Sequence, residues 1–305
     1  MPGLVARLLL ALALAAPGAA RAQSLGEVSL AAEDATPGGP EALAFDGRYV
    51  WVARPFADAL VKLSASNGDH AGSLMVERPG AVLYALSALW VTSTRANTVI
   101  KLDPRDGAVM GSFEVGHLPA ALLCDGENIW VANSGSNSLT KLDAKGRKLL
   151  TVGVQARPLA FAFDGTHVWV ANNKARTVTK LRAKDGRILG VFPAGDGPSA
   201  LAFDGENIWV ANFFSGDVMK LRAADGERLG AWRVAPGASG IAYDGHNVWV
   251  SASGTNSVTA LRGDGSVMAT YGTGRRPQQV LYDGANLWLA NSASDSVSST
   301  ALGWK

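Results

Sequence analysis

The residues of this chain that could do chemistry are few: four histidines, one cysteine, and recurring aspartates and lysines. The histidines are His70, His117, His167 and His246, and no two of them form the His-x-x-x-His pair that binds zinc on a helix. The single cysteine, Cys124, can form neither an intramolecular disulfide nor a thiolate metal cluster. The sequence also lacks a glycine-rich phosphate loop and a nucleophile elbow. It therefore predicts no catalytic residue, no metal ligand and no cofactor.

Six aspartates, each followed by glycine, could be read as a ring of carboxylates for a metal ion. They are Asp46, Asp125, Asp164, Asp204, Asp244 and Asp283. Asp-Gly is also a strong hairpin signal, because Asp bonds its own backbone and Gly tolerates a positive φ. The regular recurrence of the pair favours the turn interpretation. A structural role is likewise expected for five recurring lysines, whose stems can lie along apolar strand surface. These are Lys62, Lys101, Lys141, Lys180 and Lys220.

Tryptophans reveal the repeat that positions these groups. They are Trp51, Trp90, Trp130, Trp169, Trp209, Trp249 and Trp288, at spacings of 39 or 40 residues. Each unit divides into four short apolar or β-branched segments separated by turn residues, as in 200–203 and 208–211. A period of about 40 with four strands per unit is typical of a propeller. The predicted fold is an all-β, seven-bladed β-propeller with four-stranded antiparallel blades over residues 40–305, in which each tryptophan wedges between neighbouring blades.

Composition and the chain ends agree with this fold. The chain has 35 Gly and 48% hydrophobic residues but 18% charged ones, which indicates a turn-rich protein with a large core. The seventh copy ends without a clear fourth segment, whereas residues 25–30 resemble one. We therefore expect residues 23–39 to supply the outer strand of the last blade, which closes the ring and covers an exposed edge. In the second copy Tyr84-Ala85-Leu86-Ser87 replaces the Asp-Gly turn, so its first turn is not predicted.

Residues 1–22 have the pattern of a secretory signal: an arginine, an apolar run over 8–16 and an Ala-Arg-Ala cleavage site. A spanning helix needs about 20 apolar residues, so an uncleaved anchor is the weaker alternative. We expect a periplasmic or secreted protein without a membrane span after cleavage. Loss of Arg7 and Arg21 leaves 26 basic and 26 acidic side chains, so global charge does not favour nucleic acid.

The run Phe-Asp-Gly-x-Asn-Ile-Trp-Val-Ala-Asn at 203–212, followed by a Val-x-Lys-Leu strand, resembles the repeats of seven-bladed propellers of the YVTN and NHL types. That group includes relatives of virginiamycin B lyase. The resemblance implies a propeller fold and, for a lyase, a histidine base with carboxylates holding magnesium on neighbouring blades. No two blades offer such a set. Because the group also includes binding proteins, the fold does not define the activity.

The loops that join the second and third strands share one end of the propeller with the loops between blades. These loops differ most among the seven copies, and binding residues are commonly carried on loops. The candidate ligand- or partner-binding residues on this face are Glu41, His117, Arg157, Lys174, Arg176, Phe213 and Phe214. Glu41 begins an innermost strand, and the two phenylalanines are expected to be exposed together beside the basic residues of the fourth blade.

These features favour an exported, monomeric, non-catalytic binding module whose partner is a protein, a cell-envelope component or a small molecule. Two alternatives stay open. One is a metal-dependent lyase or hydrolase with His117 or His246 as base. The other is binding of single-stranded nucleic acid or another polyanion, which uses the same combination of basic and aromatic side chains.

Overall fold

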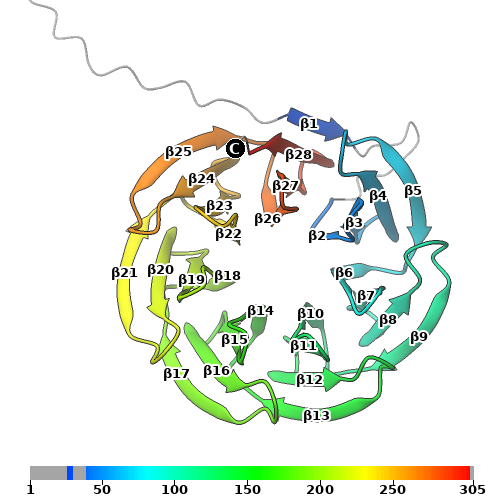
Figure 1. The fold of residues 1–305 in the computed structure, drawn as a ribbon, viewed down its shortest axis with the longest axis horizontal. Coiled ribbons are helices and arrows are strands. Elements are labelled where there is room, and N and C mark those ends of the chain that lie inside the picture. The colour runs from blue at the N-terminus through cyan, green and yellow to red at the C-terminus, as the bar shows by residue number, and fades with distance from the viewer. Residues whose placement is uncertain (1–25, 30–38, 303–305) are drawn as a thin grey trace, which may run out of the picture.

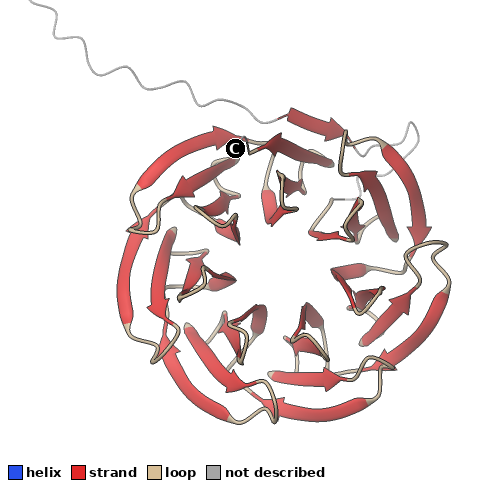
Figure 2. Cartoon of the chain, in the orientation of Figure 1, coloured by secondary structure: helices blue, strands red, loops and turns tan. Residues whose placement is uncertain are grey.

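The computed structural model describes residues 26–29 and 39–302, and over these residues all regular elements are β-strands. They form seven four-stranded antiparallel sheets arranged as blades around a central axis (Figures 1 and 2). The described residues include no helix long and apolar enough to cross a membrane. The predicted fold class is therefore confirmed. The signal segment 1–22 lies outside the described residues.

The strands of each blade follow one another from the axis outward. Blade 1 comprises β2 (Ala42–Phe45), β3 (Tyr49–Arg54), β4 (Ala59–Ser64) and β5 (His70–Met75). Blade 2 comprises β6 (Pro79–Ala85), β7 (Ala88–Ser93), β8 (Thr98–Leu102) and β9 (Val109–Glu114). Blade 3 comprises β10 (Pro119–Cys124), β11 (Ile129–Asn133), β12 (Ser138–Leu142) and β13 (Lys148–Gly153). Blade 4 comprises β14 (Pro158–Phe163), β15 (His167–Asn172), β16 (Thr177–Arg182) and β17 (Ile188–Pro193).

The remaining blades complete the circle. Blade 5 comprises β18 (Pro198–Phe203), β19 (Asn207–Asn212), β20 (Asp217–Arg222) and β21 (Arg228–Arg233). Blade 6 comprises β22 (Ala238–Tyr243), β23 (Val248–Ala252), β24 (Ser257–Leu261) and β25 (Val267–Gly272). Blade 7 comprises β26 (Pro277–Tyr282), β27 (Asn286–Asn291), β28 (Ser296–Ala301) and, on its outer edge, β1 (Gly26–Ser29).

The ring is closed by pairing the two ends of the chain. β1 pairs antiparallel with β28, from Gly26 opposite Ser299 to Ser29 opposite Ser296. Blade 7 therefore takes three strands from one end of the chain and one from the other, as Figure 1 shows. This confirms the closure predicted from the sequence.

The core lies between blades. Each of the seven repeated tryptophans is at most 1% exposed and packs against the blade that follows it. Trp169 of blade 4 contacts Leu201 and Ile208 of blade 5, for example, while Trp288 of blade 7 lies in one cluster with Val50 of blade 1. Burying such a ring removes about 150–250 Å² from water. The predicted wedge is confirmed, and it is the contact that joins one blade to the next.

The turn that the sequence did not predict, in blade 2, is made without glycine. Leu86 and Ser87 both have positive φ, 51° and 58°, which is the geometry of a type I′ hairpin. The strands on either side pair directly from Ala85 opposite Ala88. Trp90 Nε1 donates to the carbonyl oxygen of Ala85 at 3.2 Å, so a backbone group takes the place of the missing aspartate.

Deleting residues 25–32 is expected to lower the melting temperature of the protein that begins at residue 23. The deletion leaves the outer edge of β28 unpaired, and a loss of roughly 2 kcal/mol would lower the melting temperature by about 4–8 °C. Calorimetry of the proteins that begin at residues 23 and 33 makes the measurement. A protein that begins at residue 25 retains β1 and serves as the control. Equal melting temperatures for all three would contradict the closure.

Candidate ligand-binding site at the channel mouth

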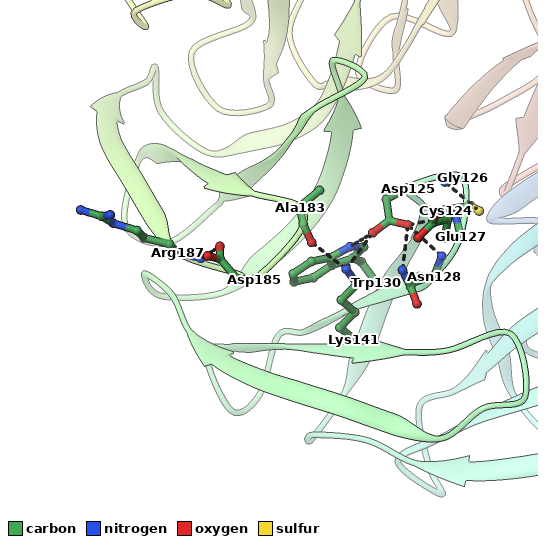
Figure 3. A network of polar contacts seen from close by, with 10 residues as sticks. All are labelled: Cys124, Asp125, Gly126, Glu127, Asn128, Trp130, Lys141, Ala183, Asp185 and Arg187. Carbon is green, nitrogen blue, oxygen red and sulfur yellow. Dashed lines mark hydrogen bonds and ion pairs between the residues drawn. The ribbon is translucent and has the colours of Figure 1, made fainter.

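The repeated aspartates are parts of the scaffold. Asp125 shows the arrangement: Oδ1 accepts the backbone N–H groups of Glu127 at 3.1 Å and Asn128 at 2.8 Å, while Oδ2 accepts Trp130 Nε1 at 2.9 Å (Figure 3). One carboxylate thus closes the first hairpin and satisfies the buried indole of the same blade. The other five make the same bond to their tryptophans at 2.7–2.9 Å; they are Asp46, Asp164, Asp204, Asp244 and Asp283.

The repeated lysines link each blade to the next. Lys141 Nζ lies 3.1 Å from Asp125 Oδ2 and 5.1 Å from the Trp130 ring, and it donates to the carbonyl oxygen of Ala183 in blade 4 at 2.6 Å (Figure 3). The other four lysines make the corresponding bond to the next blade at 2.7–3.3 Å; they are Lys62, Lys101, Lys180 and Lys220. The sequence analysis predicted a structural role for these lysines but not this bond. The sequence feature that could have revealed the bond is the constant spacing of 11 residues between tryptophan and lysine.

The carboxylates of these turns are held in their charged form. Burial alone raises the pKa of Asp125, but hydrogen bonds from Trp130, from the Asn128 and Glu127 backbones and from Lys141 outweigh it and lower the pKa below its ordinary value. The same balance lowers the pKa of Asp164, Asp204 and Asp283. Because the folded pKa is below the unfolded one, this stabilisation is present above the unfolded pKa, about 3.9, and is lost as pH falls through the folded pKa.

The substitution Asp125→Asn is expected to lower the melting temperature at neutral pH, because charge-assisted bonds to Trp130 and Lys141 are weakened by roughly 1–3 kcal/mol. The difference from the unmodified protein should shrink as the pH falls below about 4. Glu127→Gln is the matched control, since Glu127 is an exposed side chain in the same turn. Calorimetry across pH makes the measurement, and a difference that stays constant into acid would contradict the assignment.

The histidines and the cysteine do not converge. His167 Nδ1 lies 3.0 Å from Asp164 Oδ2, His70 Nε2 lies 3.0 Å from Ser73 Oγ, and His117 is exposed in the loop between blades 2 and 3. Burial raises the pKa of the Cys124 thiol. Within residues 26–29 and 39–302, no group of three His, Cys, Asp or Glu side chains is placed to hold a metal ion.

The cavity on the propeller axis is a narrow channel of about 410 Å³, lined by the beginnings of the innermost strands of all seven blades. Most of its lining is apolar or small, and several of its polar side chains bond the neighbouring backbone. Gln279 Oε1 accepts the N–H of Leu43 at 2.7 Å, and Ser199 Oγ donates to the carbonyl oxygen of Ala238 at 2.8 Å. Glu41 is the one charged residue among those that line the channel. It lies one residue before β2, where the sequence analysis expected the first residue of an innermost strand.

Glu41 is open to solvent at the mouth, yet the channel walls displace enough water to affect its ionisation. This burial raises the pKa of Glu41, and the positive charges of Arg276 and Arg78 lower it without cancelling the effect. Among the described residues Glu41 has no ion pair and no side-chain hydrogen bond partner, in contrast to the channel glutamine and serines. It is therefore an available acceptor flanked by two guanidinium groups.

One residue at the entry to each innermost strand lies at the channel mouth, directly before the strand in blades 2–7 and two residues further upstream in blade 1, and all seven have positive φ. They are Gly39, Arg78, Leu118, Arg157, Gly197, Gly237 and Arg276, with φ between 42° and 77°. A left-handed conformation costs an L-residue about 1–2 kcal/mol, whereas glycine adopts it freely. Three of the seven positions nevertheless carry arginine. We call Arg78, Arg157 and Arg276 the mouth arginines.

Each non-glycine residue of this ring is anchored by the preceding blade. The backbone N–H donates at 2.8–2.9 Å to the side-chain oxygen of an Asp or Asn in the loop between that blade's second and third strands. The pairs are Arg78 with Asp58, Leu118 with Asn97, Arg157 with Asn137 and Arg276 with Asn256. Before Gly197 and Gly237 the equivalent loop positions are Arg176 and Gly216. A hydrogen bond from the preceding blade thus stabilises the positive φ at each of the four positions that carry arginine or leucine.

The remaining predicted residues lie on the same face. Arg176 Nε pairs with Asp196 Oδ1 at 2.9 Å, and the carbonyl oxygen of Asp196 accepts the N–H of Phe214 at 3.0 Å. This brings Arg176 beside the phenylalanines. Lys174, like Arg157, has an exposed side chain, and neither forms an ion pair among the described residues.

The expectation that Phe213 and Phe214 are exposed together needs correction. Phe214 is 67% exposed, but Phe213 is half-buried, with the two rings edge to face at 5.2 Å between centroids. The Phe214 ring lies over Gly197, where a Cβ would collide with it, and the Phe213 ring packs against Phe214. Phe214 alone therefore presents an aromatic face to solvent.

Sequence reasoning missed Arg78 and Arg276 as site residues, although an Arg-Pro pair opens three of the seven copies, at 78–79, 157–158 and 276–277. It also missed a buried ion pair across the ring closure. Arg54 and Asp295 meet at 2.6 Å and are 5% and 7% exposed. This pair links blade 1 to blade 7, so Arg54 belongs to the scaffold of the mouth rather than to its free charges.

Solved structures with the same fold are known. The structure is similar to Kuenenia stuttgartiensis hydrazine synthase, with 18% identity, a TM-score of 0.77 and coverage of 92% of this chain and 100% of that chain. It is similar to a catalytically inactive virginiamycin B lyase from Staphylococcus aureus with quinupristin, with 16% identity, a TM-score of 0.78 and coverage of 92% and 99%.

A streptogramin B lyase is similar at 17% identity and a TM-score of 0.76, over 90% of this chain and 96% of that chain. No protein-family model and no curated protein matches the sequence. At identities this low the likeness defines the fold alone: this chain has the seven-bladed propeller fold of virginiamycin B lyases.

Proposed function

We propose that this chain is an exported binding module that captures an anionic ligand at the channel mouth. The observation that carries the proposal is the ring of residues before the innermost strands. Three of its positions hold the mouth arginines in a conformation that glycine would adopt at lower cost. Strain of this kind persists where the surrounding structure holds it, and it concentrates at ligand sites. The secretory pattern of residues 1–22 supports export.

The chemistry of the mouth supports an anion. Arg157 and Arg276 have exposed side chains with no ion pair among the described residues, and Arg78 rests on the Phe56 ring at 5.4 Å. Guanidinium groups bind carboxylate and phosphate in a bidentate manner. Glu41, inside the mouth, can accept a hydrogen bond from a hydroxyl or ammonium group of the same ligand. The channel volume, about 410 Å³, lies within the range of small-molecule sites.

The rim extends the surface toward blades 4 and 5. Arg176, Lys174 and the exposed face of Phe214 lie beyond the mouth on the same end of the propeller. We propose that these side chains contact the part of the ligand, or of its carrier, that remains outside the channel. Exposed apolar side chains beside basic ones are typical of such contact surfaces.

Replacing the mouth arginines by glycine should abolish binding while keeping the fold. Glycine already occupies the equivalent positions 39, 197 and 237, so the variant Arg78→Gly, Arg157→Gly, Arg276→Gly should melt no lower than the unmodified protein. Isothermal titration with citrate, glucose 6-phosphate and carboxylate-bearing peptidoglycan fragments measures binding. The triple variant Arg105→Gly, Arg147→Gly, Arg187→Gly removes equal charge from exposed turns at the other end and is the control. Equal affinity in both variants would overturn the proposal.

The substitution Glu41→Gln should strengthen binding of a purely anionic ligand, because it removes the one negative charge that lines the channel. For the same reason, affinity should rise as mildly acidic pH protonates Glu41, whose pKa is raised by burial against the influence of Arg276 and Arg78. The Gln variant should lose this pH dependence. Titration with citrate is unsuitable here because citrate itself titrates, so sulfate is the probe. A pH profile identical in both proteins would contradict the role of Glu41.

Titrations with Mg²⁺ and with a short oligonucleotide separate the other two interpretations. Stabilisation by Mg²⁺ that a chelator reverses would favour a metal-dependent lyase or hydrolase. Binding of a short oligonucleotide that weakens steeply with salt, and survives the loss of the mouth arginines, would favour a polyanion surface formed by the rim.

A further inference from the structure

The junction between blade 7 and blade 1 lacks the lysine by which blades 1–5 each bond the next blade, as does the junction between blades 6 and 7, where Ala260 lies opposite Trp249. At five junctions this lysine lies opposite the blade's tryptophan in the strand register, as Lys180 lies opposite Trp169. In blade 7 the residue opposite Trp288 is Ser299. The two blades are neighbours in the ring, where β28 and β27 lie beside β2 and β3 (Figure 1). The side chain that would bridge them is therefore missing at this junction.

The acceptors that such a lysine would use are nevertheless present. Asp283 Oδ2 accepts Trp288 Nε1 at 2.7 Å, as at the other junctions. The carbonyl oxygen of Ala65, which occupies the position of Ala183 in blade 4, faces the same place. A neutral donor stands between them: Asn286 Nδ2 lies 3.1 Å from Asp283 Oδ2 and 3.4 Å from the Ala65 oxygen.

An amide leaves the charge of Asp283 uncompensated. Asp125 and Asp204 lie 3.1 and 3.7 Å from the ammonium groups of Lys141 and Lys220. In the described part of the chain Asp283, like Asp46, has no ion pair, but the blade of Asp283 carries no lysine opposite its tryptophan. Hydrogen bonds hold the pKa of Asp283 below its ordinary value although burial raises it. The carboxylate is therefore charged at neutral pH and has room for a cationic partner.

An open cleft leads to these acceptors. It has a volume of about 630 Å³ and is lined by the turns of blades 1 and 7, including Ala65, Asp283 and Asn286. Asp69 and Asp283 contribute two negative charges to its lining, and Arg48 contributes one positive charge. The cleft lies at the opposite end of the inner strand from the mouth, because Glu41 precedes β2 at the channel and Phe45 ends β2 in the cleft.

We propose that this cleft binds a primary ammonium group, with the Asp283 carboxylate and the Ala65 carbonyl as its acceptors and the Trp288 ring beside it. The protein's own lysines are the template, since each of the five ammonium groups lies 4.9–5.2 Å from a tryptophan centroid. Such contacts add a cation–π attraction to the hydrogen bonds. The ammonium group belongs either to a free alkylamine or to a lysine side chain of another protein.

Asn286 can release the carbonyl oxygen of Ala65 to the ammonium group and keep its hydrogen bond to Asp283. In blade 5 the equivalent Asn207 donates to both oxygens of Asp204 at 3.3 Å, while Lys220 takes the carbonyl oxygen of Gly263 at 2.9 Å. Binding at the blade 7 junction would return Asn286 to this arrangement. The site is independent of the channel mouth, so its failure would leave the anion proposal untouched.

The first test places the missing lysine in the chain. Ser299→Lys should raise the melting temperature above that of Ser299→Met by on the order of 2 °C, because Met supplies a similar stem without the ammonium group. A lysine variant that melts no higher than the methionine variant would overturn the proposal.

The second test uses the unmodified protein and so does not depend on the variants. Titration calorimetry at low salt should detect n-butylammonium and Nα-acetyl-lysine methylamide, and should not detect 1-butanol or tetramethylammonium, which lack a charged N–H donor. Equal binding of both amines indicates a general amine site, and preference for the lysine derivative indicates a peptide ligand. Ser299→Lys should weaken both by at least about tenfold. Amine binding no tighter than that of 1-butanol would overturn the proposal.

Discussion

One buried tryptophan per blade is the constraint on which the structure depends. Its ring joins a blade to the next, but its indole N–H is buried and must find an acceptor. In six blades an aspartate supplies that acceptor with the same carboxylate that closes the hairpin, as Asp125 does for Trp130. In five blades a lysine opposite the tryptophan bonds the following blade, as Lys141 does. In blades 3 and 5 this lysine also lies beside the aspartate, at 3.1 and 3.7 Å. Turn, core and blade junction are therefore coupled through one carboxylate.

Because that scaffold is repeated, the departures from it are informative. The ring of residues at the channel mouth has the same backbone conformation in every blade, yet its side chains range from none at Gly197 to a guanidinium at Arg157. The fold requires the backbone conformation at these positions but not a particular side chain, so the side chains can differ according to the ligand. The junction of blades 7 and 1 departs in the opposite way: Asp283 and Ala65 keep their places while the lysine is replaced by Ser299. Both proposed sites lie where the side chains of one blade differ from those at the equivalent positions of other blades.

Much of the fold could be predicted from the sequence, but less of the site at the channel mouth could be. Asp-Gly pairs mark hairpins because the required φ is local to two residues, and tryptophan spacing reveals the blades. Glu41 could be assigned to the end of the channel because the start of an inner strand has a defined place in a propeller. Phe213 was wrongly expected to be exposed to the same extent as Phe214, since its packing against the Phe214 ring depends on the loop conformation and is not a sequence pattern. Arg78 and Arg276 were missed because nothing in an Arg-Pro pair shows that the arginine has a positive φ and faces the channel mouth.

Seven four-stranded blades, the Asp-Gly turns of six of them and the strand that closes the ring could be read from the sequence alone, because these follow from local conformation and from a regular period. The tertiary structure alone decided which side chains meet. Arg78, Arg157 and Arg276 come from loops far apart in the chain and encircle one channel, and Ala65 meets Asp283 where the two ends of the repeat array join. Those meetings depend on how the ring closes in space. The spacing of these residues along the chain does not show how close they lie in space, so both sites can be recognised only in the folded protein.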